Sequence, residues 1–376
     1  MNIDLIDKFC LISGAKSPLK MNDLQDSLDT IFYSEKAYGR LNKYLSKNPP
    51  SRIFILVDTN TNEHCLTYFL SRLEDPSDIE VIEIDAGEEY KTLETCDGVW
   101  NAMSELDGDR KSLMINLGGG VVTDLGGFVA STFKRGIPFI NIPTTLLAMV
   151  DASVGGKTGV DLGNLKNQVG VIVQPEMVLI DTNYLSTLPQ PQMRSGLAEI
   201  LKHGLIADEK YWKKLRAMNE LKYSDLDDII EKSVKIKANI VDRDPYERDE
   251  RKTLNFGHTL GHAIESFCLS NPDRKILLHG EAIAIGMILE AYISAEEKDF
   301  PKEKLEDLNN FIKDIYGVDS FSSKEIKQIQ KLLKYDKKNE YGRINFVLLE
   351  DIGLPVIDCE VDPDLIEKSF DYYLNS

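Results

Sequence analysis

Three of the five histidines in this chain lie close together and have the spacing of a metal site. His258 and His262 are four residues apart in a segment of helical periodicity, so their side chains would share one face of a helix. His279 stands at the start of the next helical segment, which can face the first. Catalytic zinc commonly takes three protein ligands. The spacing therefore predicts a divalent metal site built from these imidazoles and completed by another histidine or by a carboxylate.

The residues around the histidines exclude one common zinc motif. H-E-x-x-H needs glutamate directly after the first histidine, and Thr259 follows His258. A zinc protease is therefore disfavoured. A lone histidine in a helix is usually a structural residue, but three histidines in so short a segment favour a metal.

A charged pair lies upstream in the segment GLAEILKHG. Glu199 and Lys202 are spaced i,i+3 among small and apolar residues. The spacing alone is typical of an ion pair on a helix surface. The apolar neighbours instead favour a buried pair, which is costly unless both charges have partners.

Two glycine-rich turns are candidate anion sites. Gly118-Gly119-Gly120 follows an apolar strand and precedes an expected helix that carries Asp124, so its backbone N–H groups could hold a dinucleotide pyrophosphate. The standard G-x-G-x-x-G motif would need glycine in place of Thr123, and a simple tight turn is the alternative. Gly155-Gly156-Lys157-Thr158 resembles the end of a P-loop, but Asp151 stands where a Walker A motif needs glycine. The second turn therefore fits a phosphate or carboxylate ligand, or a solvated loop lysine.

Several basic residues lie beside glycine, asparagine or histidine, or on otherwise apolar helix faces. Each one alone would be a solvated surface charge, but together they suggest a polyanionic small molecule as ligand. They are Arg135, Lys157, Lys166, Lys202, Lys237 and Arg251.

The elements that must position these residues change type near the middle of the chain. Apolar runs closed by glycine or polar residues, with helical-length segments between them, predict a parallel α/β sheet with strands at 52–57, 113–117, 138–142 and 177–180. Helical periodicity then dominates over 196–205, 209–219, 224–241, 251–268, 280–297, 302–315 and 323–334, with weak strands at 343–349 and 354–357. Leu188-Pro189-Gln190-Pro191 is the expected linker. We therefore expect an α/β domain over 1–189 and a mainly α-helical domain over 190–376.

The composition indicates which binding partners and which cellular compartment to expect. The 376 residues include 44 Lys and Arg against 62 Asp and Glu, a formal net charge of −18, which disfavours nucleic acids and anionic membranes as partners. The sequence has no secretory signal and no apolar stretch long enough for a transmembrane helix. The cysteines are widely spaced without a CxxC motif, which predicts a reduced, cytoplasmic protein. They are Cys10, Cys65, Cys96, Cys268 and Cys359.

Five motifs together resemble the 3-dehydroquinate synthase family of sugar-phosphate cyclases. They are 118–127 GGGVVTDLGG, 143–157 PTTLLAMVDASVGGK, 196–204 GLAEILKHG, 251–265 RKTLNFGHTLGHAIE and 278–281 LHGE. The resemblance implies a Rossmann-like NAD site in the α/β domain and a site for zinc or cobalt in the helical domain. It also implies a lyase that converts 3-deoxy-D-arabino-heptulosonate 7-phosphate to 3-dehydroquinate and phosphate, in the shikimate pathway to aromatic amino acids.

The resemblance further implies roles for single residues. The metal ligands would be Glu199, His258 and His279, and His262 would then serve in proton transfer. Arg135 would reach into a neighbouring subunit, which implies a homodimer. The substrate pocket would be lined by Asp151, Lys157, Asn167, Lys202, Lys237, Arg251, Asn255 and Lys337, the last preferred over Lys338. NAD would be held by Asp58, Asn60, Glu88, Lys91, Gly119, Gly120, Asp124, Thr144, Thr145, Lys157 and Thr182, with Lys166 at the junction of cofactor and substrate.

Three alternatives remain beside this interpretation. Another cyclase of the family would act on a different sugar phosphate, but Arg251, Asn255 and His262 suit a substrate that bears a carboxylate. A metal-dependent polyol dehydrogenase would also use NAD and a metal, without needing the lysines. A non-catalytic NAD-binding regulator would need neither the metal ligands nor the basic residues.

Overall fold

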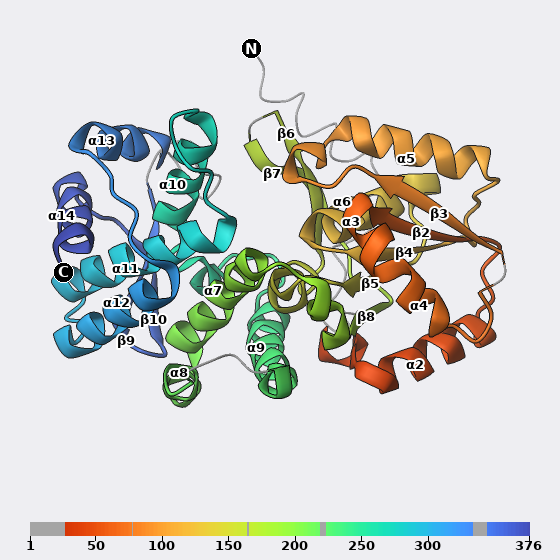
Figure 1. Ribbon diagram of the computed structural model, residues 1–376, viewed down its shortest axis with the longest axis horizontal. Helices are drawn as coiled ribbons and strands as arrows, with labels where there is room; N and C mark the ends of the chain where they lie inside the picture. Colours follow the sequence, from red (N-terminus) through yellow and green to blue (C-terminus); the bar gives the residue numbers. More distant parts are fainter. Residues whose placement is uncertain (1–26, 77, 164, 219–222, 334–343) are drawn as a thin grey trace, which may run out of the picture.

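A six-stranded parallel sheet forms the core of the N-terminal part (Figure 1). The computed structural model describes residues 27–76, 78–163, 165–218, 223–333 and 344–376. The strand order is β1-β8-β5-β4-β2-β3, and every neighbouring pair is parallel. The four predicted strands are present, and two further strands, β1 and β3, lie at the edges. The strands are β1 (Ile31–Tyr33), β2 (Ile53–Asp58), β3 (Ile79–Ile84), β4 (Leu113–Gly118), β5 (Phe139–Pro143) and β8 (Met177–Ile180).

Both faces of the sheet are covered by helices, because alternate residues of each strand face opposite sides. On β2, Phe54 and Leu56 join a core that includes residues of α5 (Leu93–Glu105) and α6 (Gly120–Thr132). Ile55 and Val57 join the opposite core, with residues of α2 (Ser34–Lys47) and α4 (Thr67–Ser71). Because all six strands are parallel, their carboxyl ends lie at the same edge of the sheet. Short helical turns complete this part: η2 (Ser27–Thr30), α3 (Thr59–Thr61), η3 (Asn62–Leu66), η4 (Glu88–Tyr90), η5 (Phe133–Arg135), η6 (Ala148–Ala152) and η7 (Thr182–Thr187).

The segment between the last two predicted strands, expected to be helical, begins with the helical turn η6 but continues as an antiparallel hairpin. The hairpin consists of β6 (Lys157–Leu162) and β7 (Leu165–Ile172). The prediction was wrong here because Val169 and Val171 have the two-residue period of a strand and contact the core beneath α6, while their neighbours are more exposed. Figure 1 shows the hairpin reaching from the sheet toward α10.

The C-terminal part is mainly helical, as predicted, and is organised around α11. This helix packs against α7, α10, α12 and α14, and its residues from Gly280 to Ala291 are buried on all sides, most of them apolar. The helices are α7 (Gln190–Ala207), α8 (Glu209–Arg216), α9 (Tyr223–Arg243), η8 (Glu250–Asn255), α10 (His258–Ser270), α11 (His279–Glu297), α12 (Lys302–Tyr316), α13 (Ser323–Leu332) and α14 (Pro363–Asn375). The antiparallel strands β9 (Phe346–Asp351) and β10 (Leu354–Cys359) form a small second sheet.

The predicted helix over 251–268 is wrong at its start. The chain forms the turn η8, reverses at Gly257 with φ of +79°, and begins α10 at His258. A Cβ atom at Gly257 would lie 2.6 Å from Cγ of Met287 on α11, so the close approach of the two helices requires glycine here. The break makes His258 the first residue of its helix.

Two expectations about the chain as a whole can be compared with the structure. Among the residues that the structure describes, no helix has the length and apolar character needed to cross a bilayer. Four of the cysteines are unpaired and buried, namely Cys65, Cys96, Cys268 and Cys359, and Cys10 lies outside the described residues.

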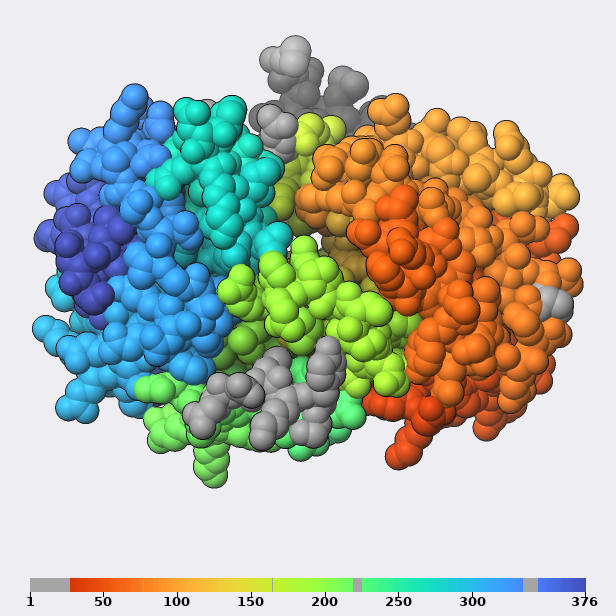
Figure 2. All heavy atoms as spheres, in the orientation of Figure 1, coloured from red at the N-terminus to blue at the C-terminus, as the bar shows by residue number. Residues whose placement is uncertain are grey.

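The space-filling view shows a hollow between the N-terminal half and the α10 region (Figure 2).

Candidate active site

Three imidazoles converge at the meeting point of α10 and α11. The ligand atoms of His258, His262 and His279 all lie within 4.8 Å of one another. His258 and His262 are one helical turn apart on α10, and His279 is the first residue of α11. The ring centroids are separated by 5.2 to 5.7 Å. The predicted histidine cluster is therefore present in the fold.

A buried carboxylate completes this cluster. Glu199 lies on α7 with no exposed surface, and its Oε1 is 3.4 Å from Nε2 of His258 and 3.8 Å from Nε2 of His279. Lys202 pairs with the other oxygen, Oε2, so the i,i+3 pair is buried rather than on the surface. Oε1 has no hydrogen-bond donor among the described residues. A buried carboxylate oxygen that faces two imidazole nitrogens without a donor fits a divalent cation such as zinc or cobalt.

Close backbone packing brings these helices together. The backbone N–H of Gly280 donates to Oγ of Ser195 on α7 at 3.0 Å, and a Cβ at Gly280 would lie 2.0 Å from the Ser195 carbonyl oxygen. Glycine at the second position of α11 therefore allows His279 to approach Glu199. Neither contact could be inferred from spacing along the chain.

Glu290 is a functional candidate that the sequence analysis missed. Its carboxylate is fully buried on α11 and accepts backbone hydrogen bonds from Gly257 at 2.6 Å and Leu260 at 3.1 Å. It thus caps the N-terminus of α10, the helix that presents two of the histidines. The sequence did contain a signal for this role. Glu290 is a glutamate in a mostly apolar helical segment, eleven residues after His279.

Glu265 is a second candidate that the sequence analysis missed. It lies on the same face of α10 as His258 and His262, and Nδ1 of His279 is 3.3 Å from its Oε2. Its Oε1 accepts a hydrogen bond from Lys166 at 2.7 Å. Burial would raise the pKa of Glu265, but the hydrogen bond and charge of His279, together with the charge of Lys166, hold it well below its usual range. Burial would likewise lower the pKa of His279, but Glu265 outweighs it and leaves that pKa raised.

Lysines and an aspartate form the next part of the site, between η6, α7 and α9. Lys237 donates to both the side chain and the carbonyl oxygen of Asp151. Burial would raise the pKa of Asp151, but the charges of Lys237 and Lys202 hold it well below its usual value. Burial lowers the pKa of Lys237, although Asp151 opposes this shift. The pair therefore places a buried ammonium beside a partly buried carboxylate.

The buried His203 is adjacent to this cationic group but belongs to the core. Its Nδ1 lies 2.5 Å from Oγ of Ser233, and it has no exposed surface. Burial and the charges of Lys202 and Lys237 lower its pKa well below the usual value. His203 is therefore a neutral imidazole beneath the lysines.

Glu247 connects two of the predicted substrate residues and was also missed. Its carboxylate forms an ion pair with Lys157 on β6 and accepts a hydrogen bond from the amide of Asn255 at 2.7 Å. The residue has φ of +57°, a conformation that is uncommon outside glycine. Its position in a turn of many charges hid it from the sequence analysis. Arg251 lies nearby, buried, and donates to the carbonyl oxygens of Pro245 at 2.8 Å and Gly155 at 3.2 Å.

The carboxyl edge of the parallel sheet carries the residues expected to hold NAD. Carboxyl ends of parallel strands share one edge, where nucleotides usually bind. Helix α6 begins directly after Gly119, so its N–H groups point toward this edge. The turn packs tightly against its neighbour, because a Cβ at Gly119 would lie 3.1 Å from Cγ2 of Thr145. The edge residues, at or just beyond the ends of β2, β4, β5 and β8, are Asp58, Asn60, Gly119, Gly120, Thr144, Thr145 and Thr182.

A buried lysine links this edge to the hairpin. The ammonium of Lys91 donates to Oδ2 of Asp124 and to Oδ1 of Asn167, both at 2.6 Å. Burial would lower the pKa of Lys91, but the charges of Asp124 and Glu88 outweigh it. Asn167, expected in the substrate pocket, thus lies with the cofactor residues.

Two predicted residues lie elsewhere. Arg135 is exposed, has φ of +72° and lies before the start of β5, at the opposite end of that strand from Thr144. It is therefore not part of the cluster within its own subunit. Lys337, and its alternative Lys338, lie outside the described residues.

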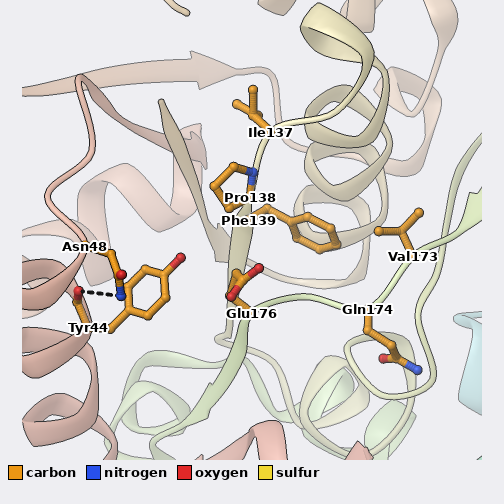
Figure 3. A pocket seen from close by; sticks show the side chains of 8 residues that line it. All are labelled: Tyr44, Asn48, Ile137, Pro138, Phe139, Val173, Gln174 and Glu176. Carbon is orange, nitrogen blue, oxygen red and sulfur yellow. Dashed lines mark hydrogen bonds between the residues drawn. The ribbon is translucent and has the colours of Figure 1, made fainter. Parts of the chain in front are cut away.

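A separate surface cavity lies at the amino ends of β5 and β8 (Figure 3). It encloses about 470 Å³ and is lined by Tyr44, Asn48, Phe139, Gln174 and Glu176, among others. It contains neither the histidines nor the lysines of the cluster. The cavity is thus at the other end of the sheet from the site described above.

Models of one enzyme family and related proteins match this chain over most of its length. The N-terminal model of 3-dehydroquinate synthase matches residues 81–195, and the C-terminal model matches residues 196–339. The 3-dehydroquinate synthase of Parabacteroides distasonis is 41% identical over 340 residues, which cover 90% of this chain and 96% of that protein.

Two solved cyclase structures have the same fold along nearly the whole chain. A 2-deoxy-scyllo-inosose synthase complexed with carbaglucose-6-phosphate, NAD+ and Co2+ is 26% identical, with a TM-score of 0.80, covering 91% of this chain and 96% of that one. The 2-epi-5-epi-valiolone synthase of Streptomyces hygroscopicus, with NAD+ and Zn2+ bound, is 25% identical, with a TM-score of 0.81, covering 96% and 99%. The sequence matches and the shared fold lead to one conclusion: the chain belongs to the 3-dehydroquinate synthase family.

Proposed function

We propose that this protein is a 3-dehydroquinate synthase, a phosphorus–oxygen lyase that converts 3-deoxy-D-arabino-heptulosonate 7-phosphate to 3-dehydroquinate and phosphate. The observation that carries the proposal is the convergence of Glu199, His258 and His279 beside buried lysines, in a chain of this family. The proposed domains, 1–189 and 190–376, would supply the cofactor side and the metal side of one site.

Glu199, His258 and His279 would hold the divalent metal, zinc or cobalt. When bound, such a metal would hold substrate oxygens and favour loss of a hydroxyl proton. The carboxylate and the imidazoles orient that end of the substrate. His262, which lies in the same cluster, would accept or donate a proton beside it.

The sheet edge would hold NAD through the glycine turn and the strand-end residues. When bound, NAD would accept a hydride from the ring carbon that bears one hydroxyl, while that hydroxyl loses its proton, and would return the hydride later in the cycle. Lys91 keeps Asp124 and Asn167 in place on this side, and Lys166 extends toward the metal side. The complete proposed set is Asp58, Asn60, Glu88, Lys91, Gly119, Gly120, Asp124, Thr144, Thr145, Lys157, Lys166 and Thr182.

The basic residues would bind the two anionic groups of the substrate. Oxidation to a ketone acidifies the neighbouring C–H, so that its proton leaves and the phosphate departs with the C–O bonding electrons. Lysine and arginine near the phosphate stabilise the charge that develops on it. The groups proposed for this role are Lys157, Lys202, Lys237, Arg251 and Asn255, with Asp151 beside Lys237. Asn167 is also proposed to contact the substrate, from its place among the cofactor residues.

Glu247 adds a condition on substrate binding. Its carboxylate already pairs with Lys157 and Asn255. An anionic substrate must displace this carboxylate or bind beside it. The intramolecular pairing would keep Lys157 partly neutralised and both side chains in place before the substrate arrives.

The alternatives fit the observations less well. The cyclases with other products are 25% and 26% identical to this chain, against 41% for the 3-dehydroquinate synthase described above. A polyol dehydrogenase has no use for a buried group of lysines. A regulator has no use for a buried carboxylate oxygen that faces two imidazoles without a hydrogen-bond donor. We further propose a homodimer in which Arg135 completes the partner's site.

The decisive experiment supplies 3-deoxy-D-arabino-heptulosonate 7-phosphate together with NAD and Zn2+. Release of one phosphate for each 3-dehydroquinate formed is the expected result. Phosphate release with a different carbocycle would favour another cyclase. Absence of turnover by protein that has bound both Zn2+ and NAD would overturn the proposal.

A further inference from the structure

A continuous row of charged side chains joins the NAD side of the site to the histidine cluster. Nζ of Lys166 lies 3.7 Å from Oε1 of Glu88 and 2.7 Å from Oε1 of Glu265. The second oxygen of Glu265 lies 3.3 Å from Nδ1 of His279. The row therefore runs from Glu88 through Lys166 and Glu265 to His279.

The members of this row come from the two halves of the molecule. Lys166 is on β7 of the hairpin, whereas Glu265 is on α10 (Figure 1). Next to Lys166 on β7, Asn167 accepts the hydrogen bond from Lys91 on the cofactor side. The Lys166–Glu265 contact thus fastens a cofactor-binding hairpin to the helix that carries His258 and His262.

We propose that Glu265 is a positioning residue that couples the two ligand sites, so that a bound divalent metal and bound NAD strengthen one another's affinity. The inference rests on the proposed function, in which His279 is a metal ligand through Nε2. Glu265 would then orient His279 through Nδ1 with one oxygen and hold the hairpin through Lys166 with the other.

The physical basis is that a single buried carboxylate serves both sides. Only 9% of the Glu265 side chain is exposed, so its charge needs both donors to offset the loss of water. A ligand imidazole oriented by a carboxylate is a stronger and better-placed metal ligand. A bound metal would fix His279, and His279 would then fix Glu265. Lys166 would have a rigid hydrogen-bond acceptor in Glu265, which would hold the hairpin in place. NAD meets a site that is already ordered and loses less conformational entropy on binding.

Coupling of this kind is reciprocal and can be measured from either side. Co2+ affinity is determined by chelator competition and by the visible spectrum of the Co2+ protein, with and without saturating NAD. NAD affinity is determined by calorimetry, with and without Co2+. For the native protein we expect each ligand to tighten the other by the same factor, about fivefold or more.

Two variants test whether the coupling passes through Glu265 and Lys166. Glu265→Gln keeps the size of the side chain but removes its charge, and Lys166→Met removes only the ammonium. Each should reduce the coupling factor to near one, and the double variant should behave like either single variant because both break the same connection. Glu265→Gln should also change the visible spectrum of the Co2+ protein, whereas a purely structural role would leave that spectrum unaltered. Lys166→Met should leave the spectrum of the Co2+ protein without NAD unchanged.

A matched control removes an ion pair of the same length elsewhere. Lys232 on α9 lies 2.7 Å from Asp208 and is 46% exposed, compared with 34% for Lys166. Lys232→Met should therefore preserve the coupling factor. Thermal unfolding of all variants identifies any that fail to fold, and Lys166→Met, on a partly exposed hairpin, provides the test if Glu265→Gln does not fold.

The outcomes separate this inference from the proposed function. If the native protein binds no Co2+ or no NAD, the proposed function itself is wrong. If it binds both and forms 3-dehydroquinate, but the two ligands bind independently, the coupling is refuted. An unchanged coupling factor in Glu265→Gln and Lys166→Met would also refute it, because the effect would then pass directly between the ligands.

Discussion

Oε1 of Glu199 lies 3.4 Å from Nε2 of His258, although 59 positions separate the two residues in the sequence. The oxygen is buried and has no hydrogen-bond donor among the described residues. Such an arrangement is costly for a protein without a cation and natural for one that binds a metal.

Replacing His258 should abolish metal binding and activity together. His258→Ala removes one imidazole from the cluster, and we expect metal affinity to fall by more than about 100-fold, since loss of an outer-shell partner alone costs 10- to 100-fold. Metal content after dialysis and turnover are the measurements. His64→Ala, an exposed histidine outside the cluster, is the control. Stoichiometric Zn2+ in the His258 variant would show that the ligand assignment is wrong.

NAD should be required for turnover but not consumed. The hydride that leaves the substrate returns to a later intermediate, so many molecules of 3-dehydroquinate should form for each NAD. Product is measured against NADH absorbance during the reaction. Accumulation of NADH in step with turnover would instead favour the polyol dehydrogenase.

Asp151→Asn should destabilise the protein at neutral pH. The change leaves Lys237 buried without its anion, and we expect a loss of about 1–3 kcal/mol in the free energy of unfolding. The pKa of Asp151 is depressed below its ordinary 3.8, so the stabilisation is present above that value and is lost as the pH falls through the depressed pKa. Denaturant unfolding should therefore show a constant difference from pH 5 to 8 and a smaller one in stronger acid. A difference that grows in acid would contradict the ion pair.

Glu290→Gln should loosen the start of α10. The amide retains one acceptor but loses the charge that caps Gly257 and Leu260, so we expect about 1–2 kcal/mol of destabilisation and weaker metal binding. Unfolding and Co2+ competition are measured together. Glu325→Gln is the control, because Glu325 caps α13 away from the cluster and should affect stability alone. If both variants bind Co2+ with the same affinity, Glu290 does not support the metal site.

Arg135→Ala and Lys157→Ala should each lose activity and recover it when mixed. In a heterodimer of the two variants, one of the two sites has an intact Lys157 and an intact Arg135 from the other subunit. Random exchange should restore about a quarter of the native activity. Mass spectrometry of differently tagged subunits confirms exchange, and continued inactivity of exchanged dimers would argue against a shared site.

Local pattern predicted four strands, most of the helices and the residue types of the site, but it missed β1, β3 and the hairpin of β6 and β7. The four apolar runs became β2, β4, β5 and β8, because a strand buried on both faces must be apolar along its length. The glycine turn at 118–120 became the start of α6, because a helix that follows a buried strand so closely needs small residues. His258 and His262 could be assigned to one face from their spacing, since helical period determines which side chains are neighbours.

The tertiary structure decided which charges meet. Glu265, Glu290 and Glu247 are ordinary acidic residues in the sequence, and their roles arise from helices and a hairpin that lie far apart along the chain. The break at Gly257 was likewise invisible, because it results from contact with Met287 on another helix. Periodicity reports how a segment repeats along its own axis. Whether a buried charged side chain has a partner depends on which residues of two different helices face each other. That is determined only when the helices pack together.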